Sequence, residues 1–190
     1  GIYHTLKGDD VYIKGSRGVD TRAHLLDAIS FKKNERVLDV GCNAGLLSMY
    51  LHDRGCETTG VDNDPHIVNA SKMVANILGK KIQYAHMDLD EVEELEQYDT
   101  IALFSVFHHT KNPIENAKKI TNSCSRILLE TRLVENGKQP INGVWQPTTH
   151  WEFKSLNELV MFCEKLFEGF KFTKNLGHAD KNRYVLELVK

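Results

Sequence analysis

The segment from Val37 to Gly45 constrains the fold of this chain more than any other part of the sequence. It reads Val-Leu-Asp-Val-Gly-Cys-Asn-Ala-Gly, so an apolar strand runs directly into a glycine turn that precedes a helix pattern. Gly41 lets the backbone approach a ligand closely at the carboxyl end of the strand, and Gly45 lets the following helix pack on the sheet. The segment therefore predicts a ligand site built largely from backbone.

A second acidic residue indicates which ligand this turn binds. Asp62 ends the apolar run 58–61, about 20 residues after the glycines, where a carboxylate meets the two hydroxyls of a ribose. The turn itself has the pattern Asp39-x-Gly41-x-x-x-Gly45, without the Gly-x-Gly-x-x-Gly that gives a pyrophosphate its backbone donors. Asp39 instead suits a cationic ligand. The sequence thus favours a positively charged nucleoside over a dinucleotide.

Apolar strands alternate with amphipathic helices over most of the chain. We expect strands at 36–40, 57–61, 81–85, 99–104, 125–131, 170–173 and 184–188, and helices at 19–30, 44–54, 65–78, 90–96, 113–123 and 155–166. Asp64 and Asn112 each precede a proline and are predicted helix caps. The alternation predicts an α/β fold with a doubly wound, mostly parallel sheet.

These motifs resemble those of class I S-adenosylmethionine-dependent methyltransferases, whose ligand carries a ribose, an adenine, an ammonium group and a sulfonium. The stretch His86-Met87-Asp88-Leu89 resembles the family's adenine-binding acid, and 101–105 resembles its fourth strand. The resemblance implies a seven-stranded sheet with an antiparallel C-terminal edge, and S-adenosyl-L-methionine as cofactor with S-adenosyl-L-homocysteine as product. The implied cofactor-binding residues are Arg17, Asp39, Gly41, Asn43, Gly45, Asp62, Asn63, Asp88, Leu89 and Ser105; for Arg17, Arg22 or a surface role is the alternative.

The stretch from Ser105 to Pro113 follows the fourth strand, where the transferred methyl group is expected. It resembles a stretch with a serine, a histidine and a proline in many small-molecule and some transfer-RNA wobble-uridine methyltransferases, here Ser105-x-x-x-His109-x-x-x-Pro113. A histidine accepts a proton near neutral pH, so His109 is the first candidate for the catalytic base. His108 is the second, and a structural role for both is the alternative. Because adjacent positions point apart, we expect only one to face the ligand.

Glu130, at the end of the fifth predicted strand, is the rival base, and a salt bridge with Arg132 is its alternative role. His108, His109 and Glu130 also have the chemistry to bind a metal ion. The metal-dependent small-RNA 2'-O-methyltransferases carry Glu-x-x-Glu-His, whereas the stretch 104–108 lacks both acids. We therefore predict no metal.

The length of 190 residues predicts one methyltransferase domain, 1–190, with an N-terminal lid and first helix in 1–30. An irregular insertion at 133–150 is expected near the acceptor site. Trp145, His150 and Trp151 offer flat faces for stacking on a sugar or a base, or else close a small hydrophobic core. The first residue is Gly1 rather than methionine, which favours a domain excised from a longer polypeptide.

Composition excludes several classes of protein. The net charge is −2 and the lysine pairs are dispersed, so a nucleic-acid partner is not expected. The four cysteines lack Cys-x-x-Cys spacing, which argues against zinc and disulfides and favours a reducing, cytoplasmic location. No apolar run has the length of a membrane helix. We therefore expect no membrane association.

The sequence as a whole favours an O-methyltransferase acting on a small polar acceptor, with a sugar hydroxyl of a glycan as the specific hypothesis. This hypothesis includes possible fusion to other domains such as a glycosyltransferase. The alternatives are methylation of transfer RNA or another nucleic acid, methylation of a small phenolic metabolite, and a non-enzymatic sensor or scaffold that holds S-adenosylmethionine. A dinucleotide-dependent oxidoreductase lacks its glycine signature here.

Overall fold

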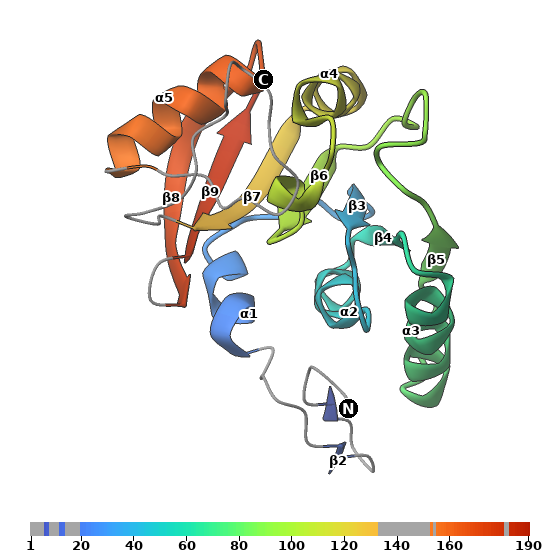
Figure 1. The fold of residues 1–190 in the computed structure, drawn as a ribbon. Helices are drawn as coiled ribbons and strands as arrows, with labels where there is room; N and C mark the ends of the chain where they lie inside the picture. Colours follow the sequence, from blue (N-terminus) through green and yellow to red (C-terminus); the bar gives the residue numbers. More distant parts are fainter. Residues whose placement is uncertain (1–5, 8–11, 14–19, 133–152, 154, 181–182) are drawn as a thin grey trace. The chain divides into compact units, whose positions relative to one another are not determined.

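A computed structural model describes residues 6–7, 12–13, 20–132, 153, 155–180 and 183–190 (Figure 1). The chain divides into two compact units, Gly1–Met87 and Asp88–Lys190. The seven long strands follow the order β5-β4-β3-β6-β7-β9-β8. The pairs β3–β4, β4–β5 and β6–β7 are parallel, and β9 pairs antiparallel with both of its neighbours, β7 and β8. The predicted α/β fold class, with its antiparallel C-terminal edge, is confirmed.

The first unit alternates helices with three parallel strands (Figure 1). Its elements are β1 (Leu6–Lys7), β2 (Tyr12–Ile13), α1 (Asp20–Leu26), β3 (Arg36–Val40), α2 (Leu46–Asp53), β4 (Glu57–Asp62), α3 (Pro65–Ile77) and β5 (Gln83–His86). β1 and β2 pair antiparallel. The strands, α2 and α3 lie within a few residues of their predicted ranges, whereas α1 is shorter than the predicted helix 19–30.

Tyr84 organises the core of the first unit. It lies directly opposite Gly60 in the parallel β4–β5 register, and its ring occupies the space that a side chain at Gly60 would need. A Cβ added at Gly60 would approach two ring carbons to 2.6 Å. Tyr84 also packs in a buried cluster with residues of α2 and α3: Met49, Val68 and Ala75. A glycine inside a strand thus marks a close approach of an aromatic ring.

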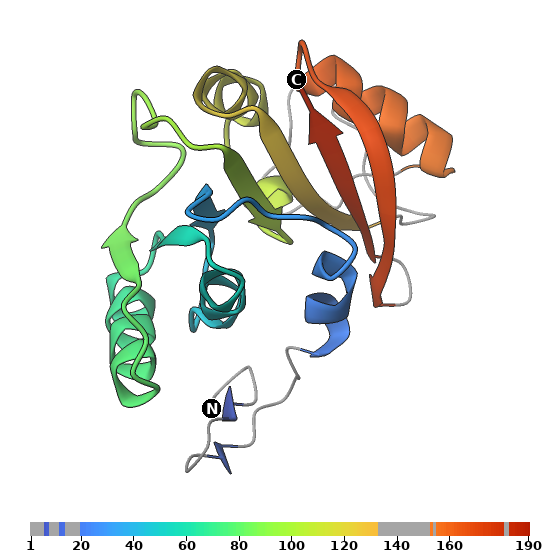
Figure 2. The same cartoon turned by 180° about the vertical axis from the view of Figure 1, so that it is seen from behind.

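The second unit places two parallel strands beside an antiparallel hairpin (Figure 2). Its elements are β6 (Thr100–Phe104), the 3-10 turn η1 (Phe107–His109), α4 (Pro113–Ser123), β7 (Arg126–Arg132), α5 (Leu156–Leu166), β8 (Lys171–Asp180) and β9 (Arg183–Val189). β6 and β7 are nearly continuous runs of buried apolar residues, as expected for strands covered on both faces. The two views show α5 on one face of the β8–β9 hairpin.

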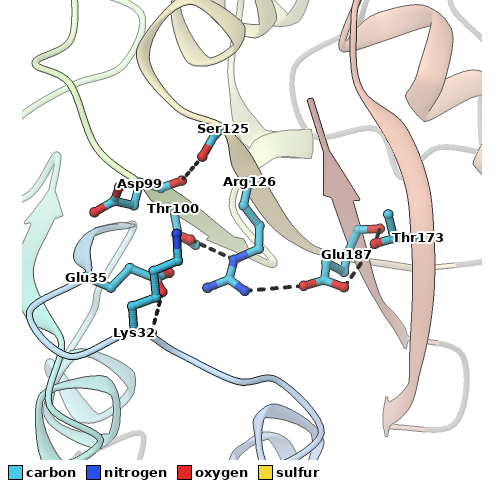
Figure 3. Close-up of polar contacts among 8 residues, drawn as sticks. All are labelled: Lys32, Glu35, Asp99, Thr100, Ser125, Arg126, Thr173 and Glu187. Carbon is cyan, nitrogen blue, oxygen red and sulfur yellow. Dashed lines mark hydrogen bonds and ion pairs between the residues drawn. The ribbon is translucent and has the colours of Figure 1, made fainter.

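A polar network centred on Arg126 links the four strands of the second unit (Figure 3). Arg126 Nε donates to Thr100 Oγ1 at 2.8 Å, and its Nη1 lies 3.5 Å from Glu187 Oε1. Thr173 Oγ1 donates to the other oxygen of the Glu187 carboxylate at 2.9 Å. These contacts join β6, β7, β9 and β8 and fix their relative register.

One prediction near the start of the second unit was wrong, and another was confirmed only in part. Residues 90–96 form no helix: residues 90 and 91 belong to a turn and 92–96 are irregular. Asp88 Oδ1 accepts from the Asp90 amide at 2.9 Å and so holds this turn. Asn112 holds the predicted N-cap position of α4, but its side chain makes no cap hydrogen bond. The Asp90 carboxylate instead fixes the segment before α4, since it accepts from the amides of Lys111 and Asn112 and from the Asn116 side chain.

The first closing strand is longer than predicted. β8 spans ten residues, against the expected 170–173. Its pairing with β9 shifts register three times, between Phe172 and Lys174, between Asn175 and Gly177, and between His178 and Asp180. Such shifts break the two-residue alternation of side chains by which a strand is identified in a sequence.

Candidate functional site

The glycine turn after β3 is built from alternating left-handed residues. Gly41, Asn43 and Gly45 have φ angles of 69°, 49° and 77°. Asn43 tolerates this conformation because its side-chain oxygen accepts from the Ala44 amide at 2.7 Å. The Asn43 carbonyl accepts from the Ser71 hydroxyl, which fixes the turn to α3. The predicted strand, turn and helix are therefore present. The turn depends on left-handed backbone conformations, which glycine and asparagine adopt more readily than other residues.

Asp62 joins the end of β4 to this turn. One carboxylate oxygen accepts from the Asn43 amide at 3.0 Å, and the other accepts from the Asp64 amide at 3.1 Å. An ionised carboxylate offers about four acceptor sites, so each oxygen is able to accept a further bond from a ligand hydroxyl. The neighbouring Asn63 is exposed, and its carbonyl lies 3.1 Å from His86 Nε2. Asp62 is thus fixed by backbone amides at the end of β4, and its contact with a ribose stays a prediction.

Asp39 is a buried carboxylate, with a residue exposure of 1%. Burial raises its pKa to about 7, the nearby charge of Asp62 adds to that rise, and a 2.6 Å hydrogen bond from Ser48 opposes it. A cation bound beside Asp39 would favour its charged form. The donor set of this turn, two carboxylates with backbone groups, therefore fits a ligand that carries both hydroxyls and a positive charge.

Gly45 makes room for Tyr84 as well as for the turn. A Cβ at Gly45 would lie 2.3 Å from the Tyr84 hydroxyl, which donates to the Gly45 carbonyl at 3.1 Å. Sequence reasoning assigned Gly45 to helix packing and missed Tyr84, Ser48 and Gly60. A glycine inside a predicted strand was the available signal for Gly60.

The second unit holds two further predicted cofactor residues, Asp88 and Leu89. The Asp88 side chain is half-buried and caps the turn that replaces the predicted helix. Leu89 is buried, and its carbonyl accepts from Lys119 Nζ at 2.9 Å. Asp90 was not predicted as a functional residue. Its carboxylate accepts hydrogen bonds from Lys111 and Asn112 and so connects this turn to the segment before α4. Contacts of Asp88 and Leu89 with a cofactor stay predictions.

Ser105 and Glu130 form a buried pair at the carboxyl ends of β6 and β7. Glu130 has no exposed surface, and its Oε1 accepts from the Ser105 hydroxyl. Ser105 is in the left-handed region with φ 56°, and its amide donates to the Glu130 carbonyl at 3.2 Å. Glu130 Oε1 also lies 3.4 Å from Arg183 Nη1 of β9. The proposed ion pair with Arg132 involves a side chain outside the described residues, and Arg183 was missed.

His108 and His109 lie in η1, directly after Ser105 and Val106. Their rings contact each other with centroids 4.1 Å apart. That only one of them faces the ligand stays a prediction. The tight 3-10 turn, which η1 forms on the buried Phe107, brings the two rings together. Partial burial, and then the positive charge of Arg183, lower the pKa of His109. Both effects favour the neutral form of the His109 ring.

Several predicted residues fall outside the described part of the chain: Arg17, Trp145, His150, Trp151 and the insertion 133–150. Arg22 of α1, the alternative to Arg17, is half-buried and lowers the pKa of Asp39 through its charge. Within the described residues, no group of three or more His, Cys, Asp or Glu side chains is arranged to hold a metal ion. None of the helices in that part of the chain has the length and apolar character to cross a membrane.

The fold and these carboxylates define a class I methyltransferase domain. A family model described as a methyltransferase domain matches residues 18–166, and the chain belongs to that family. It is 29% identical over 96 residues to a ubiquinone biosynthesis O-methyltransferase of Dechloromonas aromatica, covering 50% of this chain and 40% of the relative. It is 28% identical over 134 residues to a tRNA U34 carboxymethyltransferase of Aeromonas hydrophila, covering 67% and 40%. The chain spans about two fifths of the length of these relatives.

Solved structures agree with this fold. Magnesium protoporphyrin IX methyltransferase of Synechocystis PCC 6803, solved with bound S-adenosylmethionine, matches with a TM-score of 0.69 and 18% identity, over 90% of this chain and 77% of that one. A SAM-dependent methyltransferase of Aquifex aeolicus matches with a TM-score of 0.66 and 18% identity, over 87% and 88%. The predicted class I methyltransferase family is confirmed, and the predicted cofactor agrees with the ligand of the Synechocystis protein.

Proposed function

We propose that this domain is an S-adenosylmethionine-dependent O-methyltransferase. The observation that carries the proposal is the pair of carboxylates at one glycine turn, Asp39 buried and Asp62 fixed by backbone amides, in a chain of a methyltransferase family. Asp62 holds the ribose hydroxyls of the donor and Asp39 binds its positively charged end. Asn63 adds a contact to the nucleoside, and contacts of Asp88 and Leu89 with it stay predictions from the sequence.

When bound, S-adenosylmethionine supplies an electrophilic methyl group on its sulfonium. The domain aligns the acceptor hydroxyl with that methyl group and removes the hydroxyl proton. His109 takes the proton, because it is exposed and its lowered pKa favours the neutral form. Glu130 is less suited to this role, since its carboxylate has no exposed surface and is already bonded to Ser105 and Arg183.

The relatives, together with a base that removes a hydroxyl proton, indicate which acceptors to propose. The first candidate is the hydroxyl of a small phenolic molecule, in keeping with the ubiquinone O-methyltransferase relative. The second is a transfer-RNA uridine, favoured by carboxymethyltransferase relatives that match as much as 77% of this chain. The sugar acceptor and the glycosyltransferase fusion gain no support from the relatives and stay predictions from the sequence, as does the cytoplasmic location.

Transfer of a labelled methyl group to a panel of acceptors tests the proposal. The panel contains a catechol-type phenol, total transfer RNA and rhamnose, fucose and xylose glycosides. His109→Gln should slow turnover by roughly 100-fold, a typical contribution of a general base, and should leave donor affinity unchanged. His66→Gln, on the exposed start of α3, is the matched control and should retain full turnover.

Calorimetry separates donor binding from chemistry. Asp62→Ala should weaken binding of S-adenosylhomocysteine by about 1.5–3 kcal/mol, the usual contribution of hydrogen bonds to a charged group. Tight donor binding with no product on any acceptor, and no effect of His109→Gln, would instead support the sensor or scaffold alternative. Binding of NADH in place of S-adenosylhomocysteine would refute the donor assignment.

A further inference from the structure

The strongest unassigned feature of the second unit is Arg183. It lies at the first position of β9, opposite Arg132 and two residues before Val185, which pairs with Glu130. Its guanidinium lies 3.4 Å from the Glu130 carboxylate, and the side chains of the pair are 15% and 0% exposed. A charged pair so deeply buried costs desolvation energy, which makes a purely stabilising role a poor explanation for it.

Glu130 connects Arg183 to the segment that carries the histidines. The same carboxylate oxygen accepts from Arg183 and from the Ser105 hydroxyl, and the Ser105 amide bonds to the Glu130 carbonyl. Ser105 adopts a left-handed conformation that is rare for serine, directly before the turn that presents His108 and His109. Backbone strain of this kind is maintained only where surrounding contacts hold it in place.

We propose that Arg183, held by the buried Glu130 carboxylate, is the positioning residue of the acceptor side and sets the charge state and placement of His109. This inference rests on the proposed function of His109 as the base. It gives Glu130 a supporting role in place of the catalytic one considered from the sequence. The charged or titratable groups concerned are Arg183 on β9, Glu130 on β7, and His108 beside His109 on the turn itself.

Loss of the charge of Arg183 and loss of the charge of Glu130 should shift the pKa of His109 in opposite directions. Arg183 lowers the pKa of His109, in addition to the effect of partial burial. Removal of the positive charge in Arg183→Gln should therefore raise the pKa of His109 toward its ordinary value. Glu130→Gln removes the negative charge that lies next to Arg183, so the pKa of His109 should fall further. Arg183→Lys keeps the charge and should keep the wild-type titration.

The chain provides a matched control at the other end of the same two strands. Arg126 of β7 and Glu187 of β9 form a pair 3.5 Å apart with exposures of 16% and 15% (Figure 3). Arg126→Gln breaks an ion pair of similar geometry, also between β7 and β9, but one that does not include Glu130. It should lower stability without changing the titration of His109.

The experiment is an NMR pH titration of the His109 ring in the ligand-free protein, with His109→Gln to assign the signal. It needs no substrate, so it can fail independently of the proposed function. We expect the pKa of His109 to rise in Arg183→Gln and to fall in Glu130→Gln. It should not change in Arg183→Lys or in Arg126→Gln. Equal shifts in Arg183→Gln and Arg126→Gln, or no shift in either variant of the Arg183–Glu130 pair, would overturn the proposal.

With an acceptor identified, kinetics provide the second readout. Arg183→Gln should lower kcat by roughly tenfold through misplacement of the base, move the acidic limb of the kcat profile to higher pH, and leave KM for the donor unchanged. Arg183→Lys should restore most of kcat. If Arg183→Gln does not fold, the fall in the pKa of His109 that is expected for Glu130→Gln tests the proposal in its place. Loss of turnover at every pH in Glu130→Gln, with turnover retained in His109→Gln, would make Glu130 the base and refute the positioning role.

Discussion

Asp39 combines two properties that oppose each other in the ligand-free protein: it is a potential anion, and it is almost completely buried. Its pKa of about 7 means that the folded protein keeps the proton up to neutral pH, whereas an unfolded chain loses it near its ordinary value of 3.8. Such a group is costly in the absence of a cation. Ligand-binding residues are often destabilising in this way until the ligand arrives.

The first prediction follows from this difference in proton binding. Between about pH 4 and pH 7 the folded state binds the Asp39 proton and the unfolded state does not, so the free energy of unfolding should fall as pH rises. The fall in unfolding free energy over this range should be on the order of a few kcal/mol. Asp39→Asn should remove it and should also weaken donor binding. Urea unfolding across this pH range measures the effect.

Asp53→Asn is the control for Asp39. Asp53 is an exposed carboxylate of the same unit that pairs with Lys80 at the surface. Its substitution should leave the dependence of the unfolding free energy on pH almost unchanged. Equal changes in the two variants would show that burial of Asp39 does not control the pH response.

At the scale of single elements, Asp90 decides how α4 begins. Burial alone would raise the pKa of its carboxyl, but the hydrogen bonds from Lys111, Asn112 and Asn116 outweigh that effect and lower it. Asp90 therefore stabilises the fold above its ordinary titration range, and this contribution is lost as pH falls through its lowered folded-state pKa.

Asp90→Ala should cost about 2 kcal/mol of unfolding free energy at neutral pH, because it removes a carboxylate that accepts hydrogen bonds from Lys111, Asn112 and Asn116. Asn112→Ala is the matched control, because the sequence predicts it as the cap and the structure shows no cap bond from its side chain. We expect a change below about 0.5 kcal/mol for it. Chemical denaturation at pH 7 compares the two, and a larger loss for Asn112→Ala would contradict the assignment.

The pairing of β4 with β5 depends on the absence of a side chain at Gly60. Gly60→Ala places a Cβ 2.6 Å from the Tyr84 ring and 2.8 Å from the Ser48 hydroxyl, so the ring must move. Overpacking of this kind costs about 1–3 kcal/mol. Because Tyr84 is the obstacle, Gly60→Ala should cost much less in a Tyr84→Leu background, as measured by a double-mutant cycle of thermal unfolding.

A Gly60→Ala cost that is the same with tyrosine or leucine at position 84 would show that another contact opposes the methyl group. The result also bears on the site, since the Tyr84 hydroxyl bonds to the carbonyl of Gly45 in the glycine turn. Packing in the sheet and the shape of the ligand turn are thus coupled through one side chain.

At the scale of the whole molecule, donor binding should stabilise the folded protein by mass action. S-adenosylhomocysteine at a hundred times its Kd adds about 2.7 kcal/mol, which corresponds to a rise in Tm of roughly 5–10 °C for a chain of this size. Differential scanning fluorimetry measures it, with NADH as the comparison ligand. Stabilisation by NADH and not by S-adenosylhomocysteine would contradict the family assignment for this chain.

Most of the fold could be predicted from the sequence, because its signals are local. The strands β3, β4 and β6 and the helices α3, α4 and α5 begin or end within about two residues of the predictions. The predictions failed at 90–96, where the Asp90 side chain bonds to the backbone of a distant residue, Lys111. They also failed in β8, where register shifts interrupt the alternation of side chains between the two faces of the sheet.

The sequence by itself determined the strand, glycine turn and helix around Asp39 and the acid at Asp62, because glycine conformation and hydrophobic periodicity act over a few residues. Only the tertiary structure decided which groups surround His109. Arg183 and Glu130 are 53 positions apart in the chain. The antiparallel pairing of β7 with β9 brings them together, and no local preference of either residue encodes that contact.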